Sequence, residues 1–392
     1  MRVLFYAFYF PPAPEVGAKR AAAMHDALVA GGFKVEVRTS CRLTYSDAKS
    51  RKKRALNSVQ SNPELQRRLP KSGEVLRTRN FGLKVSSYFR SIDKTILSNY
   101  FFRNTWRLIR GADAPVDIVL ATYKPSANLM LAWMAAKRYR AILIVDLRDL
   151  VSIFGRKKSV PGITWVDQKI DKFLIKKADK IIVVSPTQKA KAEKFYGRDV
   201  ALIYNGTDSA EEERITARPD INEKYIFYSG TLSPDRELAS LSLYLEKYNK
   251  TRQKPLKLYV ASSQDPTRYG GQSSDIVWLG YIPRNEVKMW MSHSEAVVLL
   301  EGRESTAAEN IPAKLFEYLG VRKKIIADCY KKSDVVDIIN ATRCGAHVAN
   351  FQEFCEVMES EPVLCEAAMQ RFTRKTQMKE FIMLLRQYVN KK

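Results

Sequence analysis

Two carboxylates and one ammonium group surround the start of a predicted helix in the stretch ENIPAKLFEYLG, residues 309–320. Pro312 fits the first turn of a helix, where its missing amide hydrogen costs no hydrogen bond. Glu309 therefore lies in the preceding loop, and Glu317 lies more than one turn inside the helix. A helix N-terminus carries unpaired N–H groups and a partial positive charge, and Lys314 adds a full charge. This spacing predicts a diphosphate at the helix start, with a carboxylate on each side.

Carboxylates accept hydrogen bonds from hydroxyl groups. A ligand with hydroxyls on both sides of a diphosphate is a nucleotide sugar, of which Glu317 would hold the ribose and Glu309 the transferred sugar. The alternative is that both are solvated surface residues, as most charged side chains are. The proline turn, the lysine and the preceding apolar run AVVLL favour the ligand site.

The elements that must position these groups form two series in which strands alternate with helices. The first series predicts helices near 18–30, 126–138, 163–177 and 187–195, and strands at 2–9, 34–40, 116–122, 141–146, 180–185 and 200–206. The second predicts strands at 225–230, 256–261, 276–283, 296–300 and 323–328, helices near 236–249 and 285–292, the helix of Glu317, and a last helix from about 366. The basic, polar stretch 42–80 predicts a long excursion or a partly disordered loop, and the acidic stretch 207–222 a crossing between domains.

The fold class is therefore α/β, with two Rossmann-like, doubly wound parallel sheets facing a cleft, where ligands of such folds bind. The expected domains are 1–206 and 207–370, and a C-terminal helix over 371–392 packs back on the N-terminal domain. Five scattered cysteines without a CxxC pair argue against a disulfide framework or a zinc site and fit a reducing cytosol. The apolar opening run ends at Pro11, too early for a signal peptide or a membrane span.

The net charge of +24 is concentrated in one segment. Residues 42–110 hold 17 Lys and Arg against 4 Asp and Glu, and such a segment attracts the phosphates of nucleic acid, anionic lipid or a lipid-linked diphosphate. Within it, Val85–Ile96 predicts a helix laid on the core. The basic run 49–54 and the aromatic and basic residues that follow the helix suit an anionic lipid surface. The residues that follow the helix are Tyr100, Phe101, Phe102, Arg103, Trp106, Arg107 and Arg110.

The Glu309-x7-Glu317 spacing in its strand–loop–helix setting resembles the signature of retaining glycosyltransferases of family 4, which have the GT-B fold. The resemblance covers nearly the whole chain, through YFPPAPEVGAKRAAAMHDALVAGGFKVEVRTS, VDIVLAT, IVDLRDL, ADKIIVVSPTQKAKAEKFYGRDVALIYNGTD, YIFYSGTLSPDRE and IVWLGYIPRNEVKMW. It implies that the N-terminal domain faces the acceptor and that the C-terminal domain binds the nucleotide-sugar donor.

The resemblance also implies roles for individual residues. Arg236 and Lys314 would contact the donor diphosphate, and the loop at Gly17 would pass close to it, where a side chain would block the approach. Tyr281 and Ile282 would line the nucleotide-base pocket. The plainer alternatives are that Gly17 is a turn glycine, that Arg236 lies on a helix surface and that Tyr281 only packs against its neighbours. The complete donor-binding set is Glu317, Gly17, Gly230, Thr231, Tyr281, Ile282, Asn310, Ile311 and Pro312.

One departure from the family concerns a histidine that many members place near the reacting sugar. His25, His293 and His347 are the histidines of this chain, and none follows a middle strand of the N-terminal domain. The motif DLRD (146–149) stands there instead. Asp149 is a candidate for orienting the acceptor hydroxyl and Arg148 for contacting phosphate or Asp149, although a structural Asp–Arg pair closing the loop remains an equal alternative.

The implied reaction needs no protein nucleophile, no cofactor and no metal, because positioning and electrostatic stabilisation of the leaving diphosphate carry it. The catalytic candidates are Glu309, Arg236, Lys314 and Asp149. The expected partners are a nucleotide sugar, a glycan or polyprenyl-diphosphate-linked acceptor of bacterial surface polysaccharide synthesis, and an anionic membrane, at the inner face of the cell membrane. One alternative is a GT-B relative with other chemistry, such as a nucleotide-sugar epimerase. Another is a basic nucleic-acid-binding protein, although the sequence shows no recognisable nucleic-acid-binding module.

Overall fold

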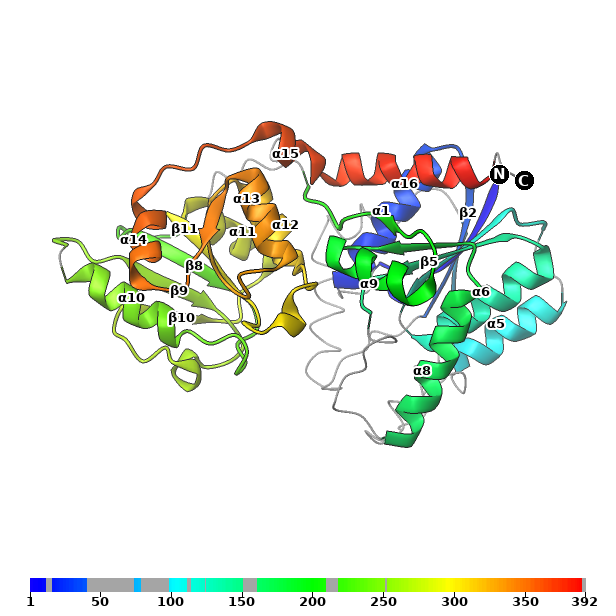
Figure 1. Ribbon diagram of the computed structural model, residues 1–392, viewed down its shortest axis with the longest axis horizontal. Coiled ribbons are helices and arrows are strands. Elements are labelled where there is room, and N and C mark those ends of the chain that lie inside the picture. Colours follow the sequence, from blue (N-terminus) through cyan, green and yellow to red (C-terminus); the bar gives the residue numbers. More distant parts are fainter. Residues whose placement is uncertain are drawn as a thin grey trace. The chain divides into compact units, whose positions relative to one another are not determined.

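The computed structural model describes residues 1–11, 16–40, 74–78, 99–110, 114–123, 125–150, 161–208, 218–250 and 252–389. The chain divides into two compact units. The first unit comprises Met1–Val184, Gln188–Tyr204 and Met378–Lys392, and the second comprises Ser185–Thr187 and Asn205–Gln377. Each unit is built on its own parallel sheet with helices on both faces (Figure 1).

The sheet of the first unit has seven parallel strands in the order β3-β2-β1-β4-β5-β6-β7. The strands are β1 (Arg2–Tyr6), β2 (Lys34–Ser40), β3 (Glu74–Thr78), β4 (Ile118–Tyr123), β5 (Ile142–Leu147), β6 (Lys180–Val183) and β7 (Ala201–Leu202). The order runs outward from β1 in one direction and from β4 in the other. The switch point at which open α/β sheets bind ligands therefore lies between β1 and β4.

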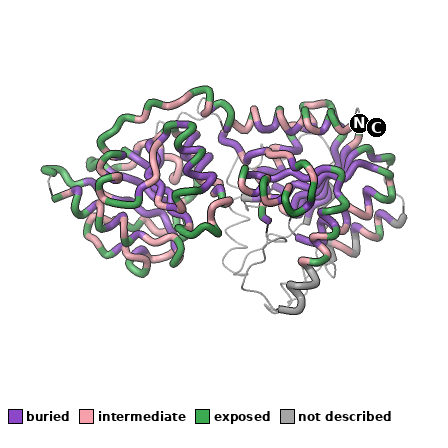
Figure 2. Tube along the Cα trace, viewed as in Figure 1, coloured by how far each residue is buried: buried purple, intermediate pink, exposed green. Residues whose placement is uncertain are grey.

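Helices cover both faces of this sheet because its strands are apolar on both sides. One face carries α5 (Asn99–Arg110), α6 (Ser126–Tyr139), α8 (Pro161–Lys176) and α9 (Pro186–Tyr196). The other carries α1 (Val16–Ala30) and α16 (Arg374–Val389) (Figure 1). Buried residues, purple in Figure 2, follow the central strands of both units.

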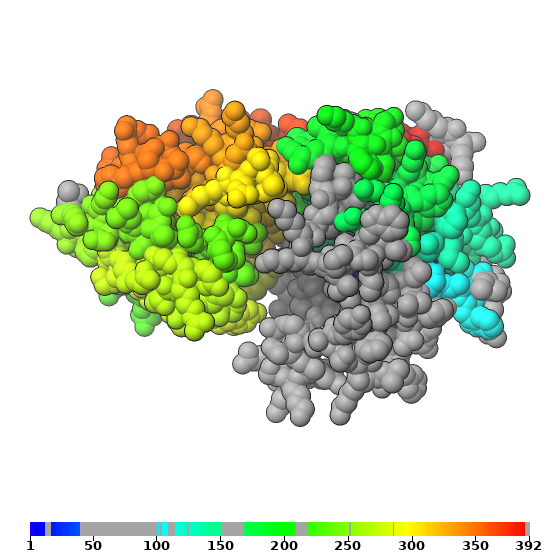
Figure 3. All heavy atoms as spheres, turned by 60° about the horizontal axis from the view of Figure 1, so that its bottom comes forward, coloured from blue at the N-terminus to red at the C-terminus, as the bar shows by residue number. Residues whose placement is uncertain are grey.

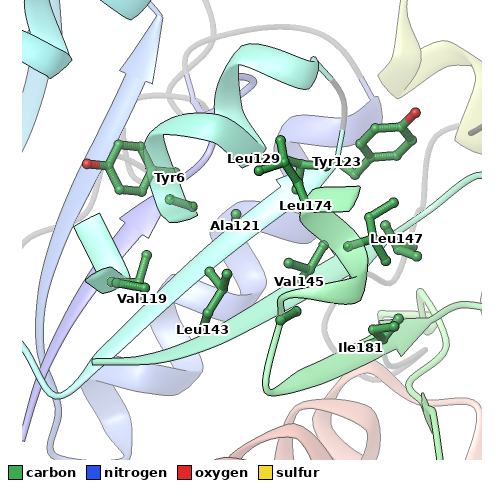
Figure 4. Close-up of a cluster of buried hydrophobic side chains, with 14 of the residues drawn as sticks. Tyr6, Val119, Ala121, Tyr123, Leu129, Leu143, Val145, Leu147, Leu174 and Ile181 are labelled. Carbon is green, nitrogen blue, oxygen red and sulfur yellow. The ribbon is translucent and has the colours of Figure 1, made fainter. Parts of the chain in front are cut away.

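The core of the first unit shows how alternate residues divide between the two faces. Val119 and Ala121 of β4 point to the cluster that contains Leu129 of α6, as Figure 4 shows. The intervening Ile118 and Leu120 belong to the opposite cluster, with α1 and α16. This alternation follows from the period of two in a strand.

The sheet of the second unit has six parallel strands in the order β10-β9-β8-β11-β12-β13. The strands are β8 (Tyr225–Ser229), β9 (Lys257–Ala261), β10 (Ile276–Gly280), β11 (Ala296–Leu300), β12 (Lys324–Asp328) and β13 (Gly345–His347). The helices are α10 (Ala239–Asn249), α11 (Arg284–His293), α12 (Ala313–Val321), α13 (Asp334–Thr342), α14 (Phe351–Glu359) and α15 (Glu366–Arg371), with 3-10 turns η2 (Pro266–Tyr269) and η3 (Ser305–Ala307). Its switch point lies between β8 and β11.

The structure confirms the predicted fold class of two doubly wound parallel sheets, and it corrects several elements. Residues 74–78, predicted within a loop, form the strand β3 beside β2. Residues 41–73 and 79–98, which include the basic run 49–54 and the predicted helix Val85–Ile96, lie outside the described residues. The sequence interpretation missed α13, β13 and α14, because these elements are short and leave little room for a period to show.

The predicted C-terminal helix is interrupted. The backbone amide of Thr207 donates to the carbonyl oxygen of Phe372 at 2.8 Å, and the amide of Arg374 donates to the carbonyl oxygen of Thr207 at 2.7 Å. Pairing with Thr207 takes these backbone groups out of the helical pattern, so α15 ends at Arg371 and α16 begins at Arg374. The part of α16 from Met378 onward belongs to the first unit, where Met378, Phe381 and Leu385 enter the core.

Candidate functional site

The loops after β8 and β11 bring charged residues to the switch point of the second sheet. Gly230 and Thr231 follow β8, and Glu301 follows β11. Gly230 has φ +149, a conformation that glycine adopts without strain and other residues rarely adopt. A Cβ at this position would lie 3.2 Å from the Tyr228 hydroxyl oxygen and 3.7 Å from Lys314 Nζ. The glycine therefore keeps the backbone close to an ammonium group at the carboxyl end of the central strand.

Arg236 is held by an acidic residue that the sequence interpretation did not consider. Its Nη2 and Nε both donate to Oε2 of Glu301, at 2.7 and 3.2 Å. The Glu301 side chain is 5% exposed and that of Arg236 is 37% exposed. The guanidinium group is thus anchored at its inner edge and reaches solvent at its outer edge.

Lys314 lies beside this ion pair. Its Nζ donates to the carbonyl oxygen of Leu300 at 3.2 Å and lies 4.8 Å from the centroid of the Tyr228 ring. Burial of the ammonium group lowers the pKa of Lys314 to about 8; Glu301 opposes this shift, and Arg236 adds to it. Two cations and one carboxylate therefore share the switch point, a charge arrangement suited to a phosphate ligand.

The start of α12 carries the two glutamates. Pro312 is the residue before the helix, with φ −68, and Glu317 is the fifth helical residue. Glu317 accepts a hydrogen bond from Arg284 at the start of α11, a partner the sequence did not predict. The carbonyl oxygen of Glu309 accepts from Ser185 Oγ at 3.0 Å.

The other predicted donor residues of this loop differ in exposure. Asn310 is exposed, and its amide donates to the carbonyl oxygen of Ala307 at 3.0 Å. Ile311 is buried. The structure thus places the backbone of 309–312 directly before the N-terminus of α12, beside Lys314.

Tyr281 and Ile282 lie apart from these groups. They follow β10, the edge strand, which β9 separates from β8. The end of β10 is therefore two strand spacings, about 10 Å, from the end of β8. Tyr281 is 79% exposed. Trp278 of β10, half-exposed, donates from Nε1 to the carbonyl oxygen of Ser262 at 2.9 Å, and the sequence interpretation did not single it out.

In the first unit, Gly17 and Arg148 lie together. A Cβ at Gly17 would come within 2.1 Å of Arg148 Nη1, so any larger residue would displace the guanidinium group. Gly17 is in the first turn of α1, where the helix N-terminus favours anions. Asp149 is exposed at the end of β5.

The buried ion pair of the DLRD motif joins Asp146 to Arg20, a residue of α1. Arg20 Nη2 donates to Asp146 Oδ1 at 2.7 Å, and Arg20 Nη1 donates to the carbonyl oxygen of Tyr204 at 2.9 Å. Both side chains are almost fully buried. Nearby, Asn128 Nδ2 donates to the carbonyl oxygens of Tyr6 and Thr122, both at 2.8 Å, and so ties β1 to β4 at the switch point.

The histidines hold structural positions. His25 is buried in α1 with its ring against that of Phe10, at a centroid distance of 5.6 Å. His347 Nε2 is 3.0 Å from the carbonyl oxygen of Cys329. Among the described residues, no three His, Cys, Asp or Glu side chains gather as metal ligands would.

The α5 helix divides between core and surface. Leu108 is buried and Phe101 packs against the core, which corrects the prediction that Phe101 suits a lipid surface. Trp106 is 56% exposed, and the cyan segment that contains it lies on the surface of the first unit in Figure 3. Throughout the part of the chain that the structure describes, every helix is too short or too polar to traverse a bilayer.

Comparison with protein families finds a match to Glycosyltransferase Family 4 over residues 18–211. This match covers just under half of the chain and, with the structural neighbours, supports a glycosyltransferase of the family 4 type. A comparison with curated protein sequences found no significant match.

The solved structures support the GT-B fold of this glycosyltransferase. Sucrose-phosphate synthase from Thermosynechococcus elongatus is 13% identical with a TM-score of 0.64, and the match covers 100% of both chains. HepE of Anabaena, solved in complex with UDP, is 14% identical with a TM-score of 0.60, covering 99% of this chain and 100% of HepE. The UDP-GlcNAc 2-epimerase of Methanocaldococcus jannaschii is 8% identical with a TM-score of 0.56, covering 98% of this chain and 99% of the epimerase.

Proposed function

We propose that this glycosyltransferase moves a sugar from a nucleotide-diphosphate sugar to a glycan or lipid-linked acceptor with retention of the anomeric configuration. The observation that carries the proposal is the placement of Lys314 beside Gly230 and of Arg236 on Glu301, at the switch point of the second sheet. Two cations and a helix N-terminus are the groups that stabilise a leaving diphosphate. HepE, a structural neighbour, was solved with UDP and with UDP-glucose.

In the proposed reaction, the oxygen of an acceptor hydroxyl forms a bond to the anomeric carbon on the face from which the diphosphate leaves. The bond between that carbon and the diphosphate oxygen breaks, its electron pair stays on the diphosphate, and the hydroxyl proton passes to this oxygen. Arg236, Lys314 and the start of α12 would stabilise the charge that develops there. We propose that the reaction requires no divalent metal, because these groups already supply positive charge.

The glutamates are proposed to hold the two hydroxyl-bearing parts of the donor. Glu317 would accept hydrogen bonds from the ribose, and Glu309 from the transferred sugar. Because Arg284 donates to Glu317 in the structure, the ribose would either share this carboxylate or displace the arginine. Asn310, Ile311 and Pro312 would shape the approach to the helix start, and Tyr281 and Ile282 the base pocket.

The acceptor is proposed to be a glycan or a polyprenyl-diphosphate-linked sugar of bacterial surface polysaccharide synthesis, met at the cytoplasmic face of the membrane. The basic segment 42–110 and the exposed Trp106 support an anionic lipid surface as a partner. Arg148 beside Gly17 offers a cation for a phosphate, and the exposed Asp149 offers a carboxylate for an acceptor hydroxyl.

A nucleotide-sugar epimerase is the second candidate, because an epimerase shares the fold along its full length. Thermal-shift screening against nucleoside diphosphates and nucleotide sugars would first identify the donor. Release of nucleoside diphosphate that depends on an added acceptor then supports a transferase, whereas conversion of the nucleotide sugar without an acceptor supports the epimerase. A protein that no member of the panel stabilises would contradict both.

A further inference from the structure

Glu301 is a buried carboxylate at the carboxyl end of β11, and nothing in the proposed reaction yet uses it. Its amide donates to the carbonyl oxygen of Asp328 at 3.0 Å, which fixes the backbone beside β12. Its side chain is 5% exposed, and its Oε2 accepts both hydrogen bonds from Arg236. A carboxylate is buried at this depth only when cations compensate its charge.

The geometry of the Arg236 pair leaves one edge of the guanidinium group for a ligand. A guanidinium group has five N–H donors in a planar fork. Glu301 takes the edge formed by Nε and Nη2, so a phosphate oxygen would meet the Nη1 edge. An arginine in a loop with 37% of its side chain exposed would otherwise sample many rotamers. The carboxylate therefore reduces the conformational freedom that diphosphate binding would have to restrict.

Glu301 also acts on Lys314. Burial lowers the pKa of Lys314 to about 8, the Arg236 charge lowers it further, and the Glu301 charge raises it. Without the carboxylate, two neighbouring cations would repel each other, and the lysine would lose its proton at lower pH.

We propose that Glu301 is a positioning residue for the donor diphosphate, which orients the guanidinium group of Arg236 and compensates the positive charge gathered there with Lys314. This inference rests on the proposed function, because it assumes that the two cations bind the diphosphate of a nucleotide sugar. Glu301 itself does not touch the reacting atoms.

The charged and titratable groups around Lys314 determine whether diphosphate affinity should rise or fall with pH. They are Glu301 after β11, Arg236 after β8 and the phenol of Tyr228 in β8. Burial raises the pKa of Tyr228 far above its usual value, so this phenol stays neutral. Burial likewise raises the pKa of Cys329, whose thiol feels the Glu301 charge, to about 12. Lys314 is therefore the group of this cluster that titrates near pH 8, and diphosphate affinity should fall as pH rises through this value.

The test compares Glu301→Gln with the wild type and with Glu304→Gln. Glu304 is an exposed residue three positions along the same loop, and it makes a matched control. Binding of inorganic pyrophosphate and of UDP is measured by calorimetry at pH values on either side of 8. Glu301→Gln should weaken both ligands on the order of tenfold below this pH, because Arg236 is no longer held, and by more above it, because Lys314 loses its proton more readily. The pH midpoint at which affinity falls should also move lower. Glu304→Gln should match the wild type in both respects.

A double variant separates the two roles of Glu301. In an Arg236→Ala background, Glu301→Gln should still move the pH midpoint through Lys314, but it should no longer weaken binding at lower pH. If Glu301→Gln does not fold, as judged by circular dichroism, Glu301→Asp serves instead, because it withdraws the carboxylate by one methylene group. Because Glu301→Asp keeps the charge, it should weaken binding by releasing Arg236 while moving the pH midpoint less than Glu301→Gln would.

The outcomes distinguish this inference from the proposed function. A wild-type protein that binds neither pyrophosphate nor UDP would overturn the diphosphate site itself. A wild-type protein that binds them, with Glu301→Gln unchanged in affinity and in pH profile, would overturn the role of Glu301 alone.

Discussion

Replacing Arg236 by alanine removes one of the two side-chain cations proposed to stabilise the leaving diphosphate. Loss of a single preorganised donor to a developing negative charge typically costs about 10²–10³-fold in turnover. Lys314 and the start of α12 remain, so we expect a loss within this range rather than complete inactivation. Because the diphosphate gains charge as it leaves, the effect should be larger on kcat than on the dissociation constant of the donor.

The same substitution should leave the protein folded. Breaking a fully buried ion pair costs about 3–5 kcal/mol. Arg236 is 37% exposed, and Lys314 still compensates Glu301. We therefore expect a cost nearer that of a solvent-screened pair, about 1 kcal/mol. This is small against the total stability of a folded protein.

The assay is acceptor-dependent release of nucleoside diphosphate, with thermal unfolding followed in parallel. Arg303→Ala is the matched control, because Arg303 pairs with Asp328 at the carboxyl end of the neighbouring strand β12, at 2.6 Å. The control should lose comparable stability and keep its turnover. Arg236→Ala with turnover within about threefold of the wild type would refute the assignment of the diphosphate site, since the loss of such a donor typically costs at least about 10²-fold in turnover.

The remaining predictions concern the other groups of the site. Glu317→Ala should weaken nucleotide binding, measured by calorimetry, because ribose contacts persist in the ground state. Glu309→Ala should mainly lower turnover, by about 10²-fold or more, if its sugar contact tightens in the transition state; near-normal activity in both would argue against these roles. Activity should survive EDTA, and NMR of the product should show a retained anomeric configuration, so that an inverted product would contradict the proposed mechanism. Neutralising the basic run 49–54 with Arg103 and Arg107 should release the protein from anionic vesicles while sparing donor binding, and vesicle binding that these changes leave intact would remove the membrane proposal.

Much of the fold followed from local patterns. Continuous apolar runs such as AVVLL mark strands buried on both faces, and parallel order follows from the intervening helices. The structure confirms this reading for β11 and for the central strands of both sheets. Short elements such as β3 and β13 were missed, because three to five residues carry too little periodicity, and their pairing with β2 and β12 depends on distant residues.

The sequence by itself determined the candidate residues at the helix start, because helix geometry relates Pro312, Lys314 and Glu317, and Glu309 lies in the adjoining loop. Which charges meet was decided by the tertiary structure. Arg236 pairs with Glu301 across 65 residues, and Arg20 with Asp146 across 126. Such pairs depend on the order of strands in the sheet, which no local spacing encodes. The physical reason is that burial forces each charge to find a partner wherever the fold supplies one.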